Sequence, residues 1–431
     1  MKYLTTVTGS YPRKDVQKDT LRKTTVSEKE SMAMIEWAVK DQVDLGLDII
    51  TDGESYRENM YWFYQLRLDG IDAMNKKYKH FSVGGSMKNV DLSKTHGTDG
   101  FGIECAIVTG EIKNLNTNLA KKWKKARESA PDHIEVKQTI TGPHMLARFS
   151  VNERKDIYPD DIALTRAYAK VITEEIQSVV DVGCNYIQFD EPVWTENPKE
   201  TEWAADIINE IIEKFPDVKF NLHVCGGNAH RKRGFFGRYT DMIPSFKKLK
   251  IDEIHLEHCS LHYTMLDVFK EWDFNGKISL GVIDQRINTT ETSDDILKAI
   301  EPALKYFKKD NILLTSECGF GHVPIDIVRA KIKKLVSVAR ELRWVILDEN
   351  VNNWKYRNIF LEYPFPKNLN YQYSGGLVEN MIVGLIKITD SEGQYGLGVK
   401  FNEEILKKFS YKEKVNTMIS TEEADIQLIW L

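Results

Sequence analysis

The sequence lacks the features that mark secreted, membrane-spanning and nucleic-acid-binding proteins. No apolar run of about 18 residues occurs in the chain, and residues 1–10 lack the apolar segment of a secretion signal. The five cysteines are an odd number without a disulfide-type spacing, so we expect a reduced, cytoplasmic protein. The net charge is −5 and no arginine-rich run is present, so nothing predicts binding to nucleic acid or to a membrane.

A dinucleotide-binding fingerprint is missing as well, because no G-x-G-x-x-G motif follows the first strand-like segment. Instead, strand-like and helix-like segments alternate. Strand-like segments cover residues 3–8, 47–51, 134–141, 186–189, 218–223, 253–256, 278–283 and 312–315. Helix-like segments cover residues 27–44, 162–182, 201–215, 239–248, 263–272, 293–307 and 325–343. This alternation predicts an α/β fold, a closed (β/α)8 TIM-type barrel rather than an open sheet.

Two segments interrupt this alternation. Residues 56–133 are too long for a simple strand-to-helix connection, so we expect an insertion after the second strand with its own helices and strands. Residues 345–431 break the rhythm and read as an appended α+β unit, with a hairpin at 381–399 and a helix at 402–409. We therefore expect a catalytic barrel over residues 1–344 and a C-terminal extension that covers it or forms a homo-oligomer.

Polar and ionisable side chains follow nearly every predicted strand. In a (β/α)8 barrel this end of the strands carries the active site. The residues are Ser10, Asp52, Glu54, His144, Asp190, Glu191, His223, Cys225, Glu257, Cys259, Asp284, Arg286, Glu317 and Cys318. A purely structural barrel would not need such residues at every strand end, so the pattern favours an enzyme.

Two soft metal ligands stand at the end of the fifth strand, in the motif His223-Val-Cys225. The two-residue period of a strand points both side chains to the same side. Cys318, beside a glycine turn, and Glu257 follow the eighth and sixth strands. Two thiolates, one imidazole and one carboxylate suit a zinc ion, which would activate a bound thiol. Rival ligands after the sixth strand are His258 and Cys259.

Several short motifs occur in a set order along residues 1–343. They are Gly9-Ser10-Tyr-Pro12, Asp52-Gly-Glu54, Thr141-Gly-Pro143, Gln188-Phe-Asp-Glu-Pro192, His223-Val-Cys225, Glu257 and Cys318-Gly-Phe320. In this order they resemble the catalytic C-terminal half of cobalamin-independent methionine synthase. Residues 281–284 and 317–322 are more similar to the short, single-barrel branch of that superfamily, which includes core methionine synthases and epoxyalkane:coenzyme M transferases.

The resemblance implies a barrel with one zinc ion that binds the sulfur of a thiol substrate for alkyl transfer. Carried over position by position, it implies the zinc ligands His223, Cys225, Glu257 and Cys318. It implies contacts to an amino-acid substrate at Ser10, Glu54 and Asp190. The two carboxylates would hold the ammonium group of homocysteine, and backbone N–H groups near Gly9 and Ser10 would hold its carboxylate.

The chain departs from the family pattern in three places. The full-length enzyme has an N-terminal barrel that helps to hold its folate, and this sequence shows none, so a methyl-corrinoid protein joins methyl-folate as a candidate donor. The family's proton-donating histidine is replaced by Arg286, near Asp284, and we take these two as candidate catalytic residues. Arginine is a poor general acid but a good clamp for a carboxylate or sulfonate. Residues 345–431 lie outside the pattern.

The sequence is therefore interpreted as a zinc-dependent methyltransferase that acts on the thiol of homocysteine to give methionine. One alternative is a zinc-dependent transferase of another thiol, such as an epoxyalkane:coenzyme M transferase. Glu54 and Asp190 argue against it, because a sulfonate without an amine would be repelled. A second alternative, from another class, is a non-catalytic zinc or corrinoid-partner protein, which only activity can exclude.

Overall fold

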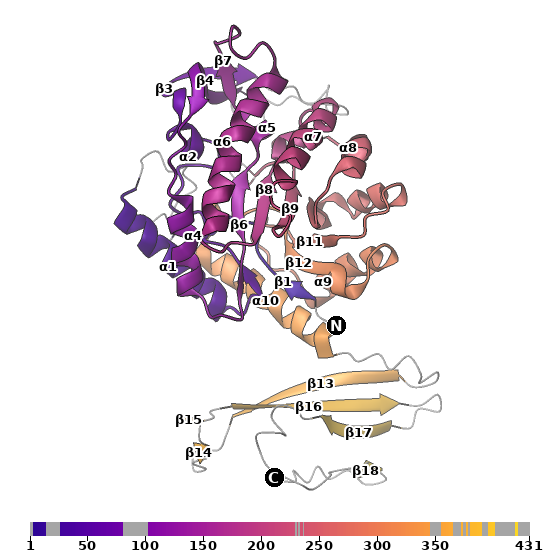
Figure 1. Ribbon diagram of the computed structural model, residues 1–431. Coiled ribbons are helices and arrows are strands. Elements are labelled where there is room, and N and C mark those ends of the chain that lie inside the picture. Colours follow the sequence, from indigo (N-terminus) through magenta and orange to yellow (C-terminus); the bar gives the residue numbers. More distant parts are fainter. Residues whose placement is uncertain are drawn as a thin grey trace. The chain divides into compact units, whose positions relative to one another are not determined.

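The computed structural model describes residues 3–13, 26–80, 102–228, 231, 233–235 and 237–344, followed by six strands within residues 355–420. The chain divides into two compact units, Met1–Arg343 and Trp344–Leu431, whose elements are labelled in Figure 1. None of the described helices combines the length and the apolar character that a membrane crossing requires.

The first unit is built on a closed barrel of parallel strands. Its strands are β1 (Leu4–Thr5), β2 (Ile49–Ile50), β5 (Glu135–Val136), β6 (Gln138–Thr141), β8 (Tyr186–Asp190), β9 (Lys219–Val224), β10 (Glu253–Glu257), β11 (Lys277–Ile283) and β12 (Ile312–Ser316). Seven of them pair in the order β1-β12-β11-β10-β9-β8-β6, and β2 pairs with β5. The backbone bonds Asp48 N to Thr5 O (3.1 Å) and Lys137 N to Ile50 O (2.8 Å) join β2 to its neighbours. This closure confirms the predicted barrel, with β5 and β6 together as its third strand.

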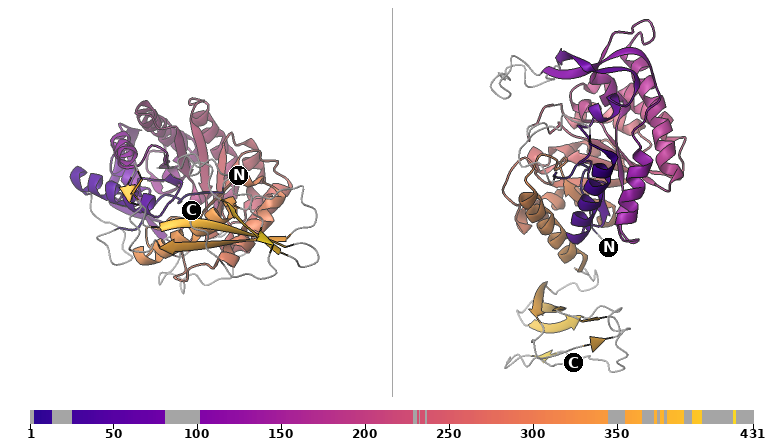
Figure 2. Two further views of the ribbon diagram at one scale, coloured as in Figure 1. Left: turned by 90° about the horizontal axis from the view of Figure 1, so that it is seen from below. Right: turned by 90° about the vertical axis from the view of Figure 1, so that its left-hand side faces the viewer.

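Helices surround this barrel (Figures 1 and 2). They include α1 (Glu28–Asp44), α4 (Leu119–Ser129), α5 (Pro143–Arg148), α6 (Asp161–Asp181), α7 (Thr201–Ile212), α8 (Ile243–Lys248), α9 (Ser293–Ile300) and α10 (Ile325–Trp344). The helix α1 begins where the sequence predicts, at a reciprocal cap. Ser27 Oγ accepts a bond from Glu30 N (3.2 Å), and Glu30 Oε2 accepts one from Ser27 N (2.8 Å).

Three predicted helices are tighter or shorter than expected. The first begins as a 3₁₀-helix, Tyr239–Met242, and the second is a 3₁₀-helix over Thr264–Lys270. The third leaves the α-helical form after Ile300 and continues as a 3₁₀-helix, Glu301–Lys305. Pro302 explains this last change, because proline has no N–H to donate and its ring clashes with the preceding turn.

The barrel interior contains paired polar groups among its apolar residues. Lys137 Nζ donates to Gln188 Oε1 (2.6 Å), and Asn221 Nδ2 donates to Glu253 Oε1 (2.9 Å). The Tyr186 hydroxyl donates to the other oxygen of Glu253 (2.6 Å). Burial lowers the pKa of Lys137 to about 8. These hydrogen bonds limit the desolvation cost of placing the groups inside.

The predicted insertion contains α2 (Trp62–Gln65), β3 (Asp69–His80), β4 (Gly102–Lys113) and α4. β3 and β4 are antiparallel, and β7 (Ser150–Asn152) adds to β4 in a three-stranded sheet (Figure 1). The helix α4 contacts α1 and α6, so it serves as the barrel's second helix rather than as part of a separate subdomain.

The second unit contains antiparallel strands. β13 (Lys355–Pro364) pairs with β16 (Asn380–Thr389), which pairs with β17 (Tyr395–Lys400), and β18 (Ile419–Ser420) follows. A separate pair joins β14 (Gln372–Tyr373) to β15 (Gly376–Leu377). Thr389 faces Tyr395, which confirms the predicted hairpin. The strand β13 is not predicted from the sequence, and the predicted helix at 402–409 lies outside the described residues.

Candidate metal centre

Three of the predicted metal ligands converge at the C-terminal rim of the barrel. His223 lies near the end of β9, Cys225 directly follows this strand, and Cys318 lies two residues beyond β12. One ligand atom from each of the three lies within 4.8 Å of the other two. The two Sγ atoms are 3.5 Å apart. In a tetrahedral zinc site with Zn–S bonds of about 2.3 Å, two sulfurs lie about 3.8 Å apart, so the spacing fits a shared ion.

The chemistry of the three donors also fits a borderline-soft divalent cation such as zinc. His223 is 2% exposed, and neither of its ring nitrogens has a hydrogen-bond partner in the described part of the chain. Cys225 is also buried. Since buried polar atoms without partners are costly, a cation bound to one ring nitrogen and to the two sulfurs would supply the partner that this nitrogen lacks.

A hydrogen bond joins the two thiols of Cys225 and Cys318. The hydrogen bond to Cys318, together with burial, raises the pKa of Cys225 well above its usual value. The same bond, assisted by His223, holds the pKa of Cys318 well below its usual value. Burial lowers the pKa of His223, but the Cys318 sulfur, Asp190 and Glu257 together raise it further than burial lowers it. The shared hydrogen bond therefore favours ionisation of Cys318 over ionisation of Cys225.

The structure places Glu257 beside these three residues, but its carboxylate is paired with two arginine side chains. One carboxylate oxygen accepts a bond from Gly226 N (2.9 Å) and pairs with Arg233 Nη2 (3.1 Å). The other oxygen pairs with the Arg286 guanidinium. Glu257 is thus next to the cluster of three ligands without being one of its members.

The rival ligands after the sixth strand point elsewhere. His258 Nε2 is bonded to the backbone oxygen of Ala299 (2.7 Å), toward the helix layer. Cys259 begins a 3₁₀-helix, Cys259–Leu261, and burial beside Glu317 raises the pKa of its thiol. The two-residue alternation fails here because β10 ends at Glu257.

The candidate catalytic residues form an ion-pair cluster behind Glu257. Arg286 Nη1 donates to Glu317 Oε2 (3.2 Å) and Nη2 donates to Gly227 O (3.1 Å). Asp284 Oδ1 accepts from the backbone N–H of Arg286 (2.8 Å), so this carboxylate stabilises its own turn. Burial and Glu257 raise the pKa of Glu317 to about 7. The Arg286 pKa is raised by the facing carboxylates, so this side chain remains a cation.

The residues predicted to contact substrate lie at the ends of β1, β2 and β8. Glu54 adopts a left-handed backbone conformation (φ 53°) and lies 3.6 Å from Arg57 Nη1. Asp190 Oδ1 accepts a bond from Gln188 Nε2 (2.7 Å). Burial, followed by the charge of Glu54, raises the pKa of Asp190 to about 7. These two carboxylates thus lie within electrostatic reach of each other, an arrangement that a bound cation would stabilise.

Gly9 and Ser10 connect this carboxylate pair to the metal side of the rim. A Cβ atom at residue 9 would overlap Glu54 Oε1, so a larger residue there would displace the Glu54 carboxylate. Ser10 O accepts a bond from Phe320 N (2.8 Å), and Ser10 Oγ lies 3.4 Å from Gly321 N. The Ser10 backbone is thereby fixed against the segment that follows Cys318.

Glu191 has a structural role, although it follows a strand at the end of the barrel that carries the site. Its carboxylate accepts bonds from the backbone N–H groups of His144 (3.0 Å) and Met145 (2.9 Å) at the start of α5. A Cβ atom on Gly142 would overlap this carboxylate. Glu191 therefore holds α5 in place and is unavailable to a substrate.

Two residues at the site carry no prediction of a role from the sequence. Arg233 lies in a loop without periodic pattern, so no signal connects it with Glu257. Glu317 directly precedes Cys318, so the sequence places it at a strand end but indicates no partner for it. Its carboxylate accepts bonds from His258 N (2.9 Å) and Ser260 N (2.7 Å), which form only in the folded turn.

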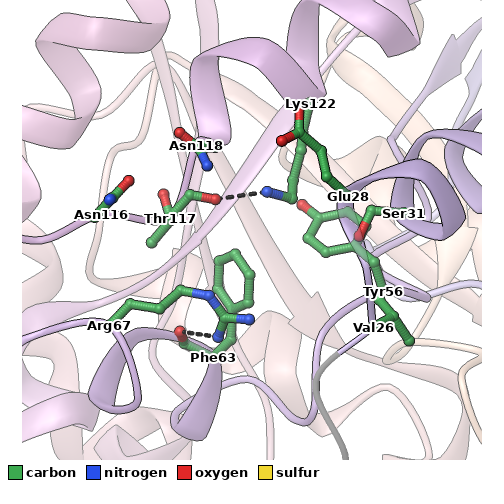
Figure 3. A pocket seen from close by; sticks show the side chains of 10 residues that line it. All are labelled: Val26, Glu28, Ser31, Tyr56, Phe63, Arg67, Asn116, Thr117, Asn118 and Lys122. Carbon is green, nitrogen blue, oxygen red and sulfur yellow. Dashed lines mark hydrogen bonds between the residues drawn. The ribbon is translucent and has the colours of Figure 1, made fainter.

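A separate cavity of about 170 Å³ lies near the beginning of α4 (Figure 3). Its lining residues are Val26, Glu28, Ser31, Tyr56, Phe63, Arg67, Asn116, Thr117, Asn118 and Lys122. Lys122 Nζ donates to Thr117 O (2.6 Å), and burial lowers the pKa of Lys122 to about 8. None of the residues predicted for the site lines this cavity.

Fold and donor set together define a (β/α)8 barrel protein with a cluster of two cysteines and one histidine at the C-terminal rim of its strands. Residues 3–341 match the family described as "Cobalamin-independent synthase, Catalytic domain". The chain belongs to this family, which confirms the resemblance inferred from the motifs. The match ends before the C-terminal unit.

Similar proteins agree with this assignment. The chain is 32% identical to a methionine synthase of Sulfolobus acidocaldarius, over 83% of this chain and 96% of that protein. It is 29% identical to a methionine synthase of Sulfurisphaera tokodaii, over 81% and 95% of the two chains. A B12-independent methionine synthase from Shewanella sp. W3-18-1, in complex with selenomethionine, shares the fold with a TM-score of 0.66 and 22% identity, over 80% of this chain and 98% of that one.

Proposed function

We propose that this protein transfers a methyl group to the thiol of homocysteine and produces methionine, with a zinc ion held at the barrel rim. The observation that carries the proposal is the convergence of His223, Cys225 and Cys318 within 4.8 Å in a chain of this family. The names of the Sulfolobus and Sulfurisphaera relatives support the choice of reaction.

The zinc ion would be held by His223, Cys225 and Cys318, with Glu257 as the neighbouring carboxylate. Zinc would lower the pKa of the substrate thiol, so that the sulfur is available as a thiolate at neutral pH. Glu257 reaches this position only by exchanging its present partners. Arg233 and Arg286 would remain nearby and balance the charge of Glu257 and Glu317.

The amino-acid part of the substrate would be held by the other half of the rim. Glu54 and Asp190 would accept hydrogen bonds from the substrate ammonium, which offsets their mutual repulsion. Backbone N–H groups at Gly9 and Ser10 would face the substrate carboxylate. These contacts would direct the sulfur toward the three metal ligands, and such positioning supplies a large part of the rate in group transfer.

Arg286 is proposed to act through charge rather than as a proton donor. Its guanidinium binds two buried carboxylates and stays protonated. It therefore occupies the position of the family's proton-donating histidine without taking over the donation of a proton. Asp284 supports the turn that presents Arg286. Methyl-folate and a methyl-corrinoid protein are the two candidate methyl donors. For the C-terminal unit, the sequence predicts that it covers the barrel or forms a homo-oligomer. A cytoplasmic location is likewise a prediction from the sequence.

The thiol substrate can be identified by titration of the cobalt-substituted protein. We expect a new sulfur-to-cobalt charge-transfer band with homocysteine and no band with coenzyme M, because a sulfonate would meet Glu54 and Asp190 without an ammonium group between them. A band with coenzyme M alone would contradict the proposal and support the function of an epoxyalkane:coenzyme M transferase. A band with neither thiol would favour a non-catalytic zinc or corrinoid-partner protein.

A further inference from the structure

Among the described residues, neither a carboxylate nor a carbonyl fixes the orientation of the His223 ring. A metal-binding histidine normally donates its second ring nitrogen to a carboxylate or a carbonyl, and this bond fixes the rotation of the ring. Among the described residues, no such partner bonds either nitrogen of His223. Because a ring that rotates freely would weaken a metal site, another contact must hold it.

His255 supplies that contact. It is the partner of His223 in the parallel register of β9 and β10, so both side chains point into the barrel. The two ring centres are 4.2 Å apart and the ring planes are tilted by 42°, so the two rings pack directly against each other. Both side chains are almost fully buried, so neither ring can turn without displacing the other.

His255 also contacts the strand end that carries Cys318. Its Nε2 atom lies 2.9 Å from the backbone oxygen of Ser316. Since a carbonyl oxygen can only accept, Nε2 carries the hydrogen. Ser316 Oγ in turn donates to the backbone oxygen of Cys318 (2.8 Å). One side chain therefore touches a ligand of β9 and supports the segment that presents the ligand after β12.

We propose that His255 is a positioning residue of the metal centre, whose ring face fixes His223 and whose Nε2–H fixes the segment Ser316–Cys318. The inference rests on the proposed zinc site and assigns no contact between His255 and either the ion or the substrate. It gives a role to a buried histidine that the reaction itself does not use.

Asp190 is a second candidate for orienting His223. It is the register partner of His223 on β8, on the side opposite His255. Its Oδ1 atom already accepts from Gln188 Nε2 (2.7 Å), and the proposed function reserves the carboxylate for the substrate ammonium. A comparison of His255 and Asp190 variants therefore shows which of the two residues orients the His223 ring.

Two substitutions separate the two contacts of His255. In His255→Gln the side-chain amide can still donate to Ser316 O, but the ring face is lost. In His255→Phe the ring face is kept and the donor is lost. We expect each to raise the zinc dissociation constant, measured by chelator competition, by roughly 10- to 100-fold, as other supporting residues of metal sites do. The Gln variant should also shift the ligand-field bands of the cobalt-substituted protein, because His223 changes its rotation.

His144→Phe is the matched control, because His144 is equally buried and bonded through Nε2, to Glu200 (2.8 Å), but is not part of the cluster. It should lower thermal stability while leaving the zinc dissociation constant and the cobalt spectrum unchanged. Asp190→Asn should raise the zinc dissociation constant less than either His255 variant does.

Wild-type zinc affinity and an unchanged cobalt spectrum in both His255 variants would overturn the inference and leave the proposed function intact. An equal loss of affinity in the His144 control would also overturn it, because general destabilisation would then explain the effect. A loss confined to Asp190→Asn would transfer the role to that residue. If the wild-type protein binds no zinc, both the inference and the proposed function fail.

Discussion

Replacing Asp190 by asparagine is expected to make the protein more stable at neutral pH and less able to use homocysteine. Asp190 is 7% exposed and lies within electrostatic reach of Glu54. Burial and this charge raise its pKa to about 7 from the ordinary 3.8. Above pH 7 the folded protein therefore carries a buried carboxylate that asparagine would replace by a neutral group of the same shape.

The stability gain follows from the sign of this shift. Because the folded state has the higher pKa, it binds more protons than the unfolded state, and the carboxyl group loses its stabilising contribution as the pH rises from 3.8 to about 7. A shift of about three units at about 1.4 kcal/mol each gives an upper limit of about 4 kcal/mol. The difference in melting temperature between variant and wild type should thus grow from pH 4 to pH 7 and stay constant above it.

The loss of activity follows from the substrate ammonium. Removal of one charged partner costs about 1.5–3 kcal/mol, or roughly 10- to 150-fold in kcat/KM for homocysteine. The control substrate is 4-mercaptobutanoate, which has no amino group and should react equally well with both proteins. A variant that is less stable than wild type at pH 8, and that still discriminates between the two thiols as wild type does, would refute the reasoning.

Three further substitutions test other parts of the rim. Gly9→Ala should raise KM for homocysteine by about tenfold or more with zinc content unchanged, because the new methyl group overlaps Glu54; an unchanged KM would contradict this. Arg286→Met should lower the melting temperature more at pH 8 than at pH 6. The pKa of Glu317 is about 7, so at pH 8 this residue tends to ionise beside Glu257, and the variant lacks the Arg286 guanidinium that binds both carboxylates. Equal losses at both pH values would count against this reasoning. Glu191→Ala should lower the free energy of unfolding by about 1–3 kcal/mol, since two backbone N–H groups lose their acceptor; a loss of bound zinc would show that its role is not purely structural.

The barrel could be predicted because its strands are buried on both sides and read as short apolar runs, such as β12, all of whose residues are buried. The three converging ligands could be predicted for the same reason, since each follows the end of such a run. This argument stops where the strand stops. The two-residue period of a strand would place Cys259 on the side of Glu257, but the chain turns into a 3₁₀-helix directly after β10.

The pairing of Glu257 could not be predicted from the sequence. Arg233 and Arg286 are distant from it in the chain and meet it only when β9, β10 and β11 lie side by side. The contact between His223 and His255 depends in the same way on the register of two strands, which a single sequence does not reveal. The strand β13 was missed because its end, Tyr363 and Pro364, reads as a turn signal.

The zinc content of the purified protein tests the central claim most directly. After dialysis against buffer without metal, we expect one zinc ion per wild-type chain and much less in Cys318→Ser, because the ligand cluster then loses one of its two sulfurs. A Cys184→Ser variant is the control, since this cysteine is buried away from the cluster and should leave zinc content unchanged. Full zinc retention in Cys318→Ser, or no zinc in the wild-type protein, would contradict the account.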